Sequence, residues 1–277
     1  MGILKKNKAR CVRVSDMNNL EIYKASYTTH TFSRHWHDGF GIGVIENGCE
    51  VFDYEGDKQW APQRSIVLMN PGVIHTGAAA NQQIGWQYHI MYPGLECLQK
   101  IAEQINEKNN SIPYFPNPVV FDNDCAEKLL NLFSLFEHSP LSMEHQSVFI
   151  NTISIILQRH STLIYTEMNR KRDNKVVNFI KEYINQYYSK SIDLGELVII
   201  SGRSKFHLLR EFEREVGIPP HTYQIFIRIQ KAKELLLKGQ SILAVALETG
   251  FTDQSHFSRH FKRILGITPR EYIYANR

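Results

Sequence analysis

The sequence of 277 residues has no uninterrupted apolar run of membrane-spanning length, so no transmembrane helix is predicted. Residues 1–16 contain several basic side chains but lack the apolar segment of a signal peptide, so we expect a cytoplasmic protein with no membrane partner. Only four cysteines are present, and none has the close spacing of a zinc or redox motif. We therefore expect reduced thiols, since disulfides are rare in the cytosol.

The sequence also has little net charge, +4 in total, but that charge is unevenly divided. Residues 174–277 contain 16 Lys and Arg against 10 Asp and Glu, whereas residues 1–173 contain 16 against 18. A basic second half favours a polyanionic partner for that half alone. Many solvated surfaces have a similar bias, so the charge by itself selects no class of function.

Short apolar or alternating runs separated by turn residues occupy residues 20–92. Strands at this close spacing predict a small barrel or a jelly roll. Prolines interrupt the pattern at 111–118, and helical spacing follows, with one helix expected over about 142–168. The apolar face of that helix could pack on its own domain or form a dimer seam. The residues of this face are Phe149, Ile153, Ile156, Leu163 and Ile164.

These patterns predict a two-domain protein of the α+β class. The expected regions are an N-terminal arm (1–19), a β-barrel domain with trailing helices (20–169), a charged linker (170–174) and an all-helical domain (175–277). The basic residues near the start of the arm fit either a disordered, solvated tail or a regulatory arm that contacts another domain.

The helical domain contains an internal repeat, because eight of its residues recur at a constant offset of 49 positions. In the first copy they are Leu194, Arg210, Phe212, Arg214, Gly217, Ile218, Pro220 and Tyr223. Phe212 returns as Phe261, for example. Each copy has the parts of a helix-turn-helix unit, at about 193–216 and 242–265. Residues 220–238 are expected to form one long helix that joins the two units.

In the second copy, Gly250 permits a left-handed turn, and Asp253 can cap the next helix. Phe257 and Phe261 lie four residues apart and anchor that helix to the core, so its opposite face is free for a DNA groove. Residues near the N-terminus of such helices read base edges. The expected base readers are Lys205, Phe206, Leu209, Arg210, Gln254, Ser255, His256 and Arg259. The expected phosphate contacts are Arg203, His207, Arg214, Lys262 and Arg263.

The stretch from Gly250 to Arg259, with Phe261-Lys262 and the run from Gly266 to Tyr272, resembles the signature of AraC-type (AraC/XylS) transcription regulators. The resemblance covers about residues 174–275. It implies a sequence-specific regulator that binds double-stranded promoter DNA and works with RNA polymerase. Leu209 departs from the family pattern, in which many relatives have a polar reader at that position.

The first half resembles the cupin-like effector domain of the same family, through His35-Trp36-His37-Asp38 and the run from Asn70 to His75. The resemblance implies a small β-barrel that binds a small-molecule effector, followed by helices through which such proteins often form homodimers. The expected pocket residues are His35, Trp36, His37, His75, Trp86 and Tyr88. Trp36 and Trp86 fit a role in the barrel core equally well.

The three histidines also suggest a metal site. A catalytic cupin adds a glutamate just after the His-x-His motif, and Gly41 and Ile42 stand in that region here. Three imidazoles without the carboxylate could still hold zinc. We nevertheless expect no metal, no other cofactor and no enzymatic activity. The alternatives are a metal-dependent cupin enzyme fused to a helical module, and a signal-binding protein with a helical protein-interaction tail.

Overall fold

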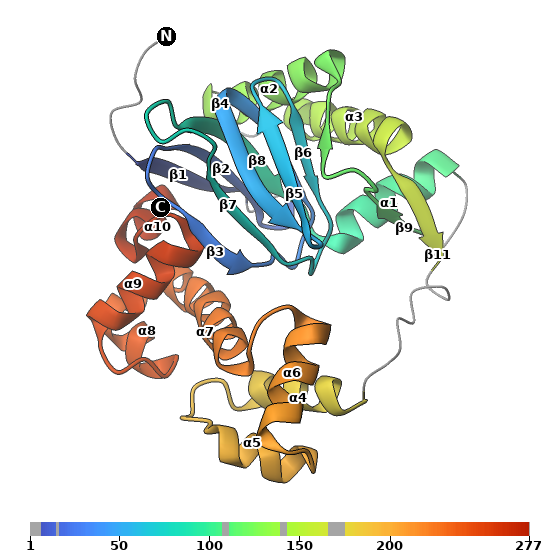
Figure 1. Ribbon diagram of the computed structural model, residues 1–277. Helices are drawn as coiled ribbons and strands as arrows, with labels where there is room; N and C mark the ends of the chain where they lie inside the picture. Colours follow the sequence, from blue (N-terminus) through green and yellow to red (C-terminus); the bar gives the residue numbers. More distant parts are fainter. Residues whose placement is uncertain (1–6, 15–16, 107–110, 139–142, 166–174, 277) are drawn as a thin grey trace. The chain divides into compact units, whose positions relative to one another are not determined.

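The computed structural model describes residues 7–14, 17–106, 111–138, 143–165 and 175–276 (Figure 1). The chain divides into two units, residues 1–169 and 170–277. The predicted linker at 170–174 lies outside the described residues. No helix in the described ranges is both long and apolar enough to span a bilayer.

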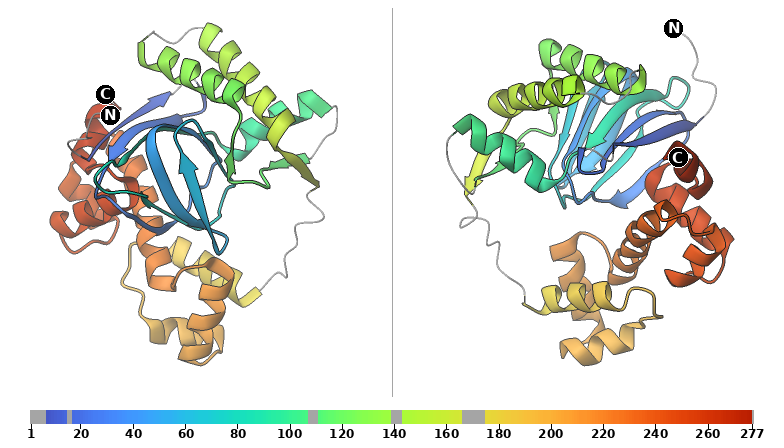
Figure 2. Two further views of the ribbon diagram at one scale, coloured as in Figure 1. Left: turned by 45° about the horizontal axis from the view of Figure 1, so that its top comes forward. Right: turned by 180° about the vertical axis from the view of Figure 1, so that it is seen from behind.

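Unit 1 is built on a nine-stranded sheet in which every strand pair is antiparallel. Its strands are β1 (Lys8–Val14), β2 (Leu20–Tyr27), β3 (Phe32–His35), β4 (Gly41–Tyr54), β5 (Asp57–Pro62), β6 (Ile66–Met69), β7 (His75–Ala79), β8 (Trp86–Tyr92) and β10 (Val119–Val120). The long strand β4 pairs with β5, β6, β7 and β8, so the sheet curls round on itself, as Figure 2 shows. This is the antiparallel barrel-like domain that the closely spaced strands predict.

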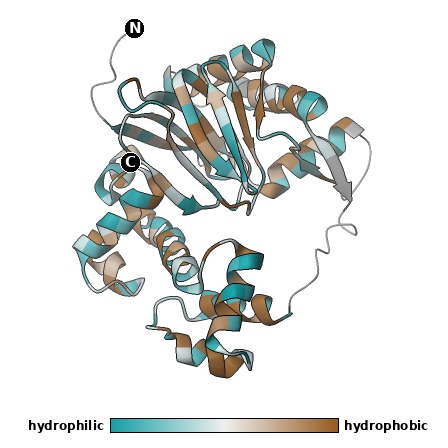
Figure 3. Cartoon of the chain, viewed as in Figure 1, coloured by the Kyte–Doolittle hydropathy of each residue, from teal (hydrophilic) through white to brown (hydrophobic). Residues whose placement is uncertain are grey.

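Two apolar cores flank this sheet. Inside the curl, Tyr27, Phe52 and Trp86 are almost fully buried together. On the outer side, three helices cover the sheet, and their apolar faces join buried residues of the strands, such as Ile42 and Leu68. These helices are α1 (Leu95–Asn106), α2 (Asn123–His138) and α3 (Met143–His160). Hydropathy therefore alternates along many strands of unit 1 (Figure 3), because successive side chains face opposite sides of a strand.

Two parts of unit 1 differ from the sequence expectation. Residues 8–14, expected in the arm, form β1 and pair along their whole length with β2. Cys11 and Val14 are buried, and three basic residues mask this alternation in the sequence. The helix expected over 142–168 ends at His160, and residues 162–165 form β11, which pairs with β9 (Ser111–Tyr114).

The apolar face of α3 is used within its own unit. Phe149, Ile153 and Ile156 are buried in the outer core with Leu129 and Phe133 of α2. These three residues therefore do not form a dimer seam, whereas Ile150 on the same helix is exposed.

Unit 2 is entirely helical. Its helices are α4 (Lys175–Gln186), α5 (Leu194–Ser201), α6 (Lys205–Val216), α7 (Pro220–Leu237), α8 (Ile242–Glu248), α9 (Gln254–Leu265) and α10 (Pro269–Ala275). The predicted cap Asp253 is confirmed, because its side chain accepts a hydrogen bond at the start of α9. Ser204 does the same at the start of α6. Gly217 and Gly266 end these helices in left-handed conformations. The repeat in sequence is thus also a repeat of two capped helix pairs, α5–α6 and α8–α9.

Candidate functional site

The turn between α8 and α9 fixes which face of α9 points outward. Gly250 has a φ of +85°, and a Cβ atom there would overlap the carbonyl oxygen of Ser189. Asp253 Oδ1 accepts a hydrogen bond from the backbone N–H of His256 at 2.7 Å. Phe257 and Phe261 are fully buried beneath the helix. Glycine geometry, cap and anchors thus act together to present the opposite face of α9 to solvent.

That outward face of α9 is polar and basic. Gln254, Ser255, Arg259 and Lys262 are all exposed, which leaves their polar atoms accessible to a ligand. Their positions match the expectation for readers near the N-terminus of α9 and a cation near its C-terminus. These four side chains therefore do not contribute to the buried core of unit 2.

His256 differs from the other expected readers because its ring already has partners. Its Nε2 atom lies 2.9 Å from Nε2 of His260, and its Nδ1 atom lies 3.4 Å from the Thr252 hydroxyl. Burial and the nearby Arg263 charge lower the pKa of His260 to about 4. A neutral His260 allows the close Nε2 contact, in which one ring donates and the other accepts. His256 must exchange these partners before it can contact a base.

Helix α6 of the first pair presents a more apolar face. Leu208 and Phe212 are fully buried, whereas Phe206 is 76% exposed and Leu209 is partly exposed. Lys205 and Arg210 are also exposed on this helix. An exposed phenylalanine near a helix N-terminus offers contact to thymine methyl groups rather than a hydrogen bond.

Three of the expected phosphate contacts lie beside carboxylates. Arg203 and His207 both face Glu211, at 3.4 and 3.5 Å, and Arg214 bonds Glu215 at 3.0 Å. Sequence reasoning missed these pairings, although His207 and Glu211 have the i,i+4 spacing of neighbours on a helix. The remaining N–H donors of the exposed Arg203 and Arg214 can still reach a phosphate beside these carboxylates.

Arg228 on α7 ties the two helix pairs together. Its guanidinium donates to the carbonyl oxygens of Tyr188 at 2.7 Å, Lys190 at 2.9 Å and Gly250 at 2.6 Å. The first two carbonyls follow α4 on the side of the first pair, and the third lies in the turn of the second pair. Gln224, one turn earlier on α7, bonds the same two carbonyls after α4. This position of Arg228 between the two helix pairs emerges only from the structure.

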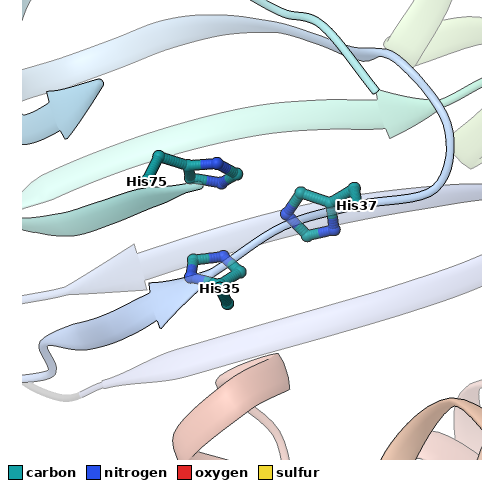
Figure 4. Close-up of side chains that lie close together, drawn as sticks. All are labelled: His35, His37 and His75. Carbon is teal, nitrogen blue, oxygen red and sulfur yellow. The ribbon is translucent and has the colours of Figure 1, made fainter. Parts of the chain in front are cut away.

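The histidines of unit 1 lie together (Figure 4). His35 ends β3 and His75 begins β7, and the two are direct partners across that strand pair. His37 follows in the connection after β3, and one potential ligand atom from each ring lies within 4.8 Å of the others. His35 and His75 are almost completely buried, and His37 is partly exposed. The structure thus brings together three of the six expected pocket residues.

Burial keeps the two inner imidazoles neutral. Desolvation lowers the pKa of His35 to about 4, partly opposed by the carbonyls of Ser33 and His75. Burial and the neighbouring His35 lower the pKa of His75 to about 3. Nδ1 of His35 lies 2.8 Å from the Ser33 carbonyl, and Nδ1 of His75 lies 2.9 Å from the Val73 carbonyl. Each Nδ1–H therefore donates to a carbonyl, which leaves each Nε2 with its lone pair.

The other expected pocket residues have separate surroundings. Trp36 donates from Nε1 to Asp38 at 3.3 Å and is 8% exposed. Trp86 is fully buried in the inner core, and Tyr88 stacks on it with a ring separation of 6.2 Å. Nε1 of Trp86 has no hydrogen-bond partner among the described residues. The packing of Trp86 fits the core role that the sequence allowed, and its Nε1 atom, unpartnered among the described residues, also fits the role in a pocket.

Glu50 on β4 is a buried acid that sequence reasoning missed. Its side chain faces the interior, as do Phe52 and Tyr54 at the period of two that a strand imposes. Burial raises its pKa to about 8, and among the described residues its carboxyl has no hydrogen bond or ion pair. The alternation of inward and outward residues along this strand is the sequence signal that could have identified Glu50 as an inward-facing acid.

Glu50→Gln is expected to stabilise unit 1 at alkaline pH. The raised pKa of the folded carboxyl means that stability is lost as pH rises from about 4.5 towards about 8, because the unfolded chain ionises first. The glutamine amide does not ionise, so the variant avoids this loss. We expect its free energy of unfolding to exceed that of the native protein by about 2–4 kcal/mol at pH 8 and by almost nothing at pH 4.5. Urea unfolding followed by tryptophan fluorescence, with a chelator present, measures it. A gain that is equal at both pH values would contradict the buried-carboxyl account.

Comparisons with known proteins match both units. A model of the AraC-like ligand binding domain matches residues 18–153, and a helix-turn-helix domain model matches residues 198–274. The chain belongs to the AraC-type transcription regulators. It is a DNA-binding regulator with an N-terminal ligand-binding domain, as the sequence resemblance implied.

Relatives of this regulator match between about half and nearly all of its length. The uncharacterized HTH-type transcriptional regulator YbfI of Bacillus subtilis is 26% identical and aligns over 90% of each chain. The probable transcriptional regulator LumQ of Photobacterium leiognathi is 36% identical over 54% of this chain and 60% of its own. The crystal structure of ToxT from Vibrio cholerae has a TM-score of 0.55 at 13% identity, covering 98% of this chain and 97% of its own. That last likeness shows the two-domain fold.

Proposed function

We propose that α6 and α9 enter successive major grooves on one face of promoter DNA, about 34 Å apart. The observation that carries this proposal is the repetition of one helix pair, each with the same capped turn and the same buried anchors. Arg228 holds the two pairs in one arrangement through three hydrogen bonds. Such a chain reads an asymmetric site without needing a palindrome.

The two helices contribute differently to base reading. On α9, Gln254 and Arg259 have the bidentate groups that pair with adenine and guanine, and Ser255 adds a hydroxyl. On α6, Arg210 and Lys205 are the polar readers, and Phe206 and Leu209 contact thymine methyl groups. The phosphate contacts position the protein rather than specify the sequence. They come from Arg203, His207, Arg214, Lys262 and Arg263.

A small organic molecule is proposed as the effector of unit 1. The support is the match to a ligand-binding domain and an interior in which aromatic rings surround a few polar groups. ToxT of Vibrio cholerae has been crystallised with an unsaturated fatty acid and with (E)-4-(8-methylnaphthalen-1-yl)but-3-enoic acid. We assign contacts with such a ligand to Tyr88 and to the Nε1 atom of Trp86, in addition to the three histidines.

The remaining roles follow from the family. A regulator of this kind acts on chromosomal DNA, so we propose that it works in the cytoplasm, contacts RNA polymerase and forms a homodimer through residues other than the buried face of α3. We propose no enzymatic activity. The metal-dependent cupin enzyme gains no support, since the histidine cluster contains no carboxylate among the described residues.

The proposed DNA contact is tested by the salt dependence of binding to a labelled promoter fragment. Each phosphate contact should contribute a slope of about −0.9 to a plot of log K against log salt, so the five proposed contacts predict a steep fall in affinity. A fragment of scrambled sequence is the control and should bind more weakly at every salt concentration. Affinity that does not change with salt would point instead to a helical protein-interaction module.

A further inference from the structure

Three imidazoles converge in the barrel of unit 1, and the DNA-binding function does not use them. His35, His37 and His75 come from two segments that are 40 residues apart in the sequence, yet their ring centroids are only 4.3–5.2 Å apart. Figure 4 shows the three rings gathered between β3 and β7. One nitrogen from each lies within 4.8 Å of the other two. Side-chain rotation can bring such nitrogens to the ~2.0–2.1 Å of a zinc–nitrogen bond.

The hydrogen bonds around the inner rings match those of metal-binding histidines. A histidine that binds a metal through one ring nitrogen usually donates its other N–H to a carboxylate or a backbone carbonyl, which fixes ring orientation and tautomer. His35 and His75 do this towards the carbonyls of Ser33 and Val73. Their direct pairing across β3 and β7 holds the two backbones in register. These tautomers leave Nε2 of each inner ring as the nitrogen with a lone pair for a metal.

The buried surroundings of the cluster include an aromatic ring and a buried acid. The ring of Tyr92 lies 4.1 Å from that of His37, and Tyr92 also interacts electrostatically with the buried Glu50. Glu50 has no ion-pair partner among the described residues.

Against the sequence expectation of no metal, we propose that His35, His37 and His75 bind one divalent transition-metal ion. Imidazole suits zinc and its first-row neighbours, whereas magnesium and calcium prefer oxygen ligands, so the ligand set selects the first class. Three protein ligands leave a fourth position open. The proposal concerns unit 1 alone and does not depend on DNA binding.

A second cluster of metal-ligating residue types is explained without an ion. Asp122 accepts hydrogen bonds from the backbone N–H of Cys125, from Arg159 and from His160, the last at 2.9 Å. These hydrogen bonds occupy the oxygens of the Asp122 carboxylate. The positive charge of Arg159 beside it also repels a metal ion. This cluster therefore serves as the matched control for the first.

The test is zinc binding by the full chain after chelator treatment and dialysis. Elemental analysis gives the stoichiometry, and competition with a chromophoric chelator gives the affinity. We expect one zinc per chain in the native protein and in His160→Gln. We expect an affinity at least about 10–100-fold lower in His37→Gln and His75→Gln, since even outer-shell changes have effects of that size. Cobalt(II) should give the absorption bands of a nitrogen-ligated site in the native protein and in His160→Gln, but not in His37→Gln or His75→Gln.

His37→Gln keeps the test decisive, because His37 is partly exposed and its replacement should leave the fold intact by circular dichroism. Excess magnesium should not displace zinc from the native protein. Three results would overturn the proposal: native protein that holds no zinc, a folded His37→Gln that binds zinc as tightly as the native chain, or loss of zinc in His160→Gln alone.

Discussion

Arg228→Met should lower the free energy of unfolding of unit 2 by at least about 3 kcal/mol, since hydrogen bonds to charged groups contribute about 1.5–3 kcal/mol each. The guanidinium donates to three backbone carbonyls, and methionine leaves those acceptors without it. Promoter affinity should fall as well, because the hydrogen bonds that hold the two helix pairs in one arrangement are lost. Arg228→Lys should not restore stability, since one ammonium cannot replace the planar fork.

The chain allows this effect to be assigned to unit 2. All three tryptophans, Trp36, Trp60 and Trp86, lie in unit 1, whereas unit 2 is entirely helical. In urea, the circular dichroism transition of Arg228→Met should therefore shift while the tryptophan fluorescence transition stays in place. Lys231→Met on the same helix is the control, because Lys231 makes only an exposed ion pair with Glu234, and it should change stability by less than about 0.5 kcal/mol. A native-like circular dichroism transition in Arg228→Met would refute this role of Arg228.

Arg259→Ala should weaken binding to the promoter site by about 1–3 kcal/mol and relax the preference for one base pair. Arg259 is exposed on α9, where the buried Phe257 and Phe261 fix its direction. Arginine bonds both acceptors of a guanine edge, and alanine cannot. Binding to a panel of sites with single base-pair changes measures both effects.

Lys262→Ala on the same helix is the matched control for Arg259→Ala. A phosphate contact should weaken binding to all sequences alike and reduce the salt slope by about 1. Unchanged affinity and unchanged base preference in Arg259→Ala would remove this residue from the set of base readers.

The sequence predicted unit 2 well because its signals are local. A glycine turn, a cap residue and two anchors four positions apart specify a helix pair within about twenty-five residues, and the repeat at an offset of 49 doubles the evidence. The same reasoning failed for β1 and β11, where strand formation depends on a partner far along the chain. Pairing of β1 with β2 buries Cys11 and Val14. No local sequence pattern predicts this pairing.

The sites show the same division between local and distant information. The sequence identified His35, His37 and His75 as candidates, but only the pairing of β3 with β7 brings His35 and His75 face to face. The carboxylate partners of Arg203 and Arg214, and the three acceptors of Arg228, likewise depend on side-chain positions that spacing does not specify. Glu50 was within reach, since its inward position follows from the alternation of β4.

Hydroxyl-radical footprinting of the full chain on a site selected from random DNA tests the central claim most directly. Two recognition helices on one chain predict two protected windows on the same face of the duplex, about 10–10.5 base pairs apart, within an asymmetric sequence. Arg259→Ala should weaken protection in the window that α9 contacts more than in the other. A single protected window, or a binding site that is always palindromic, would contradict the account.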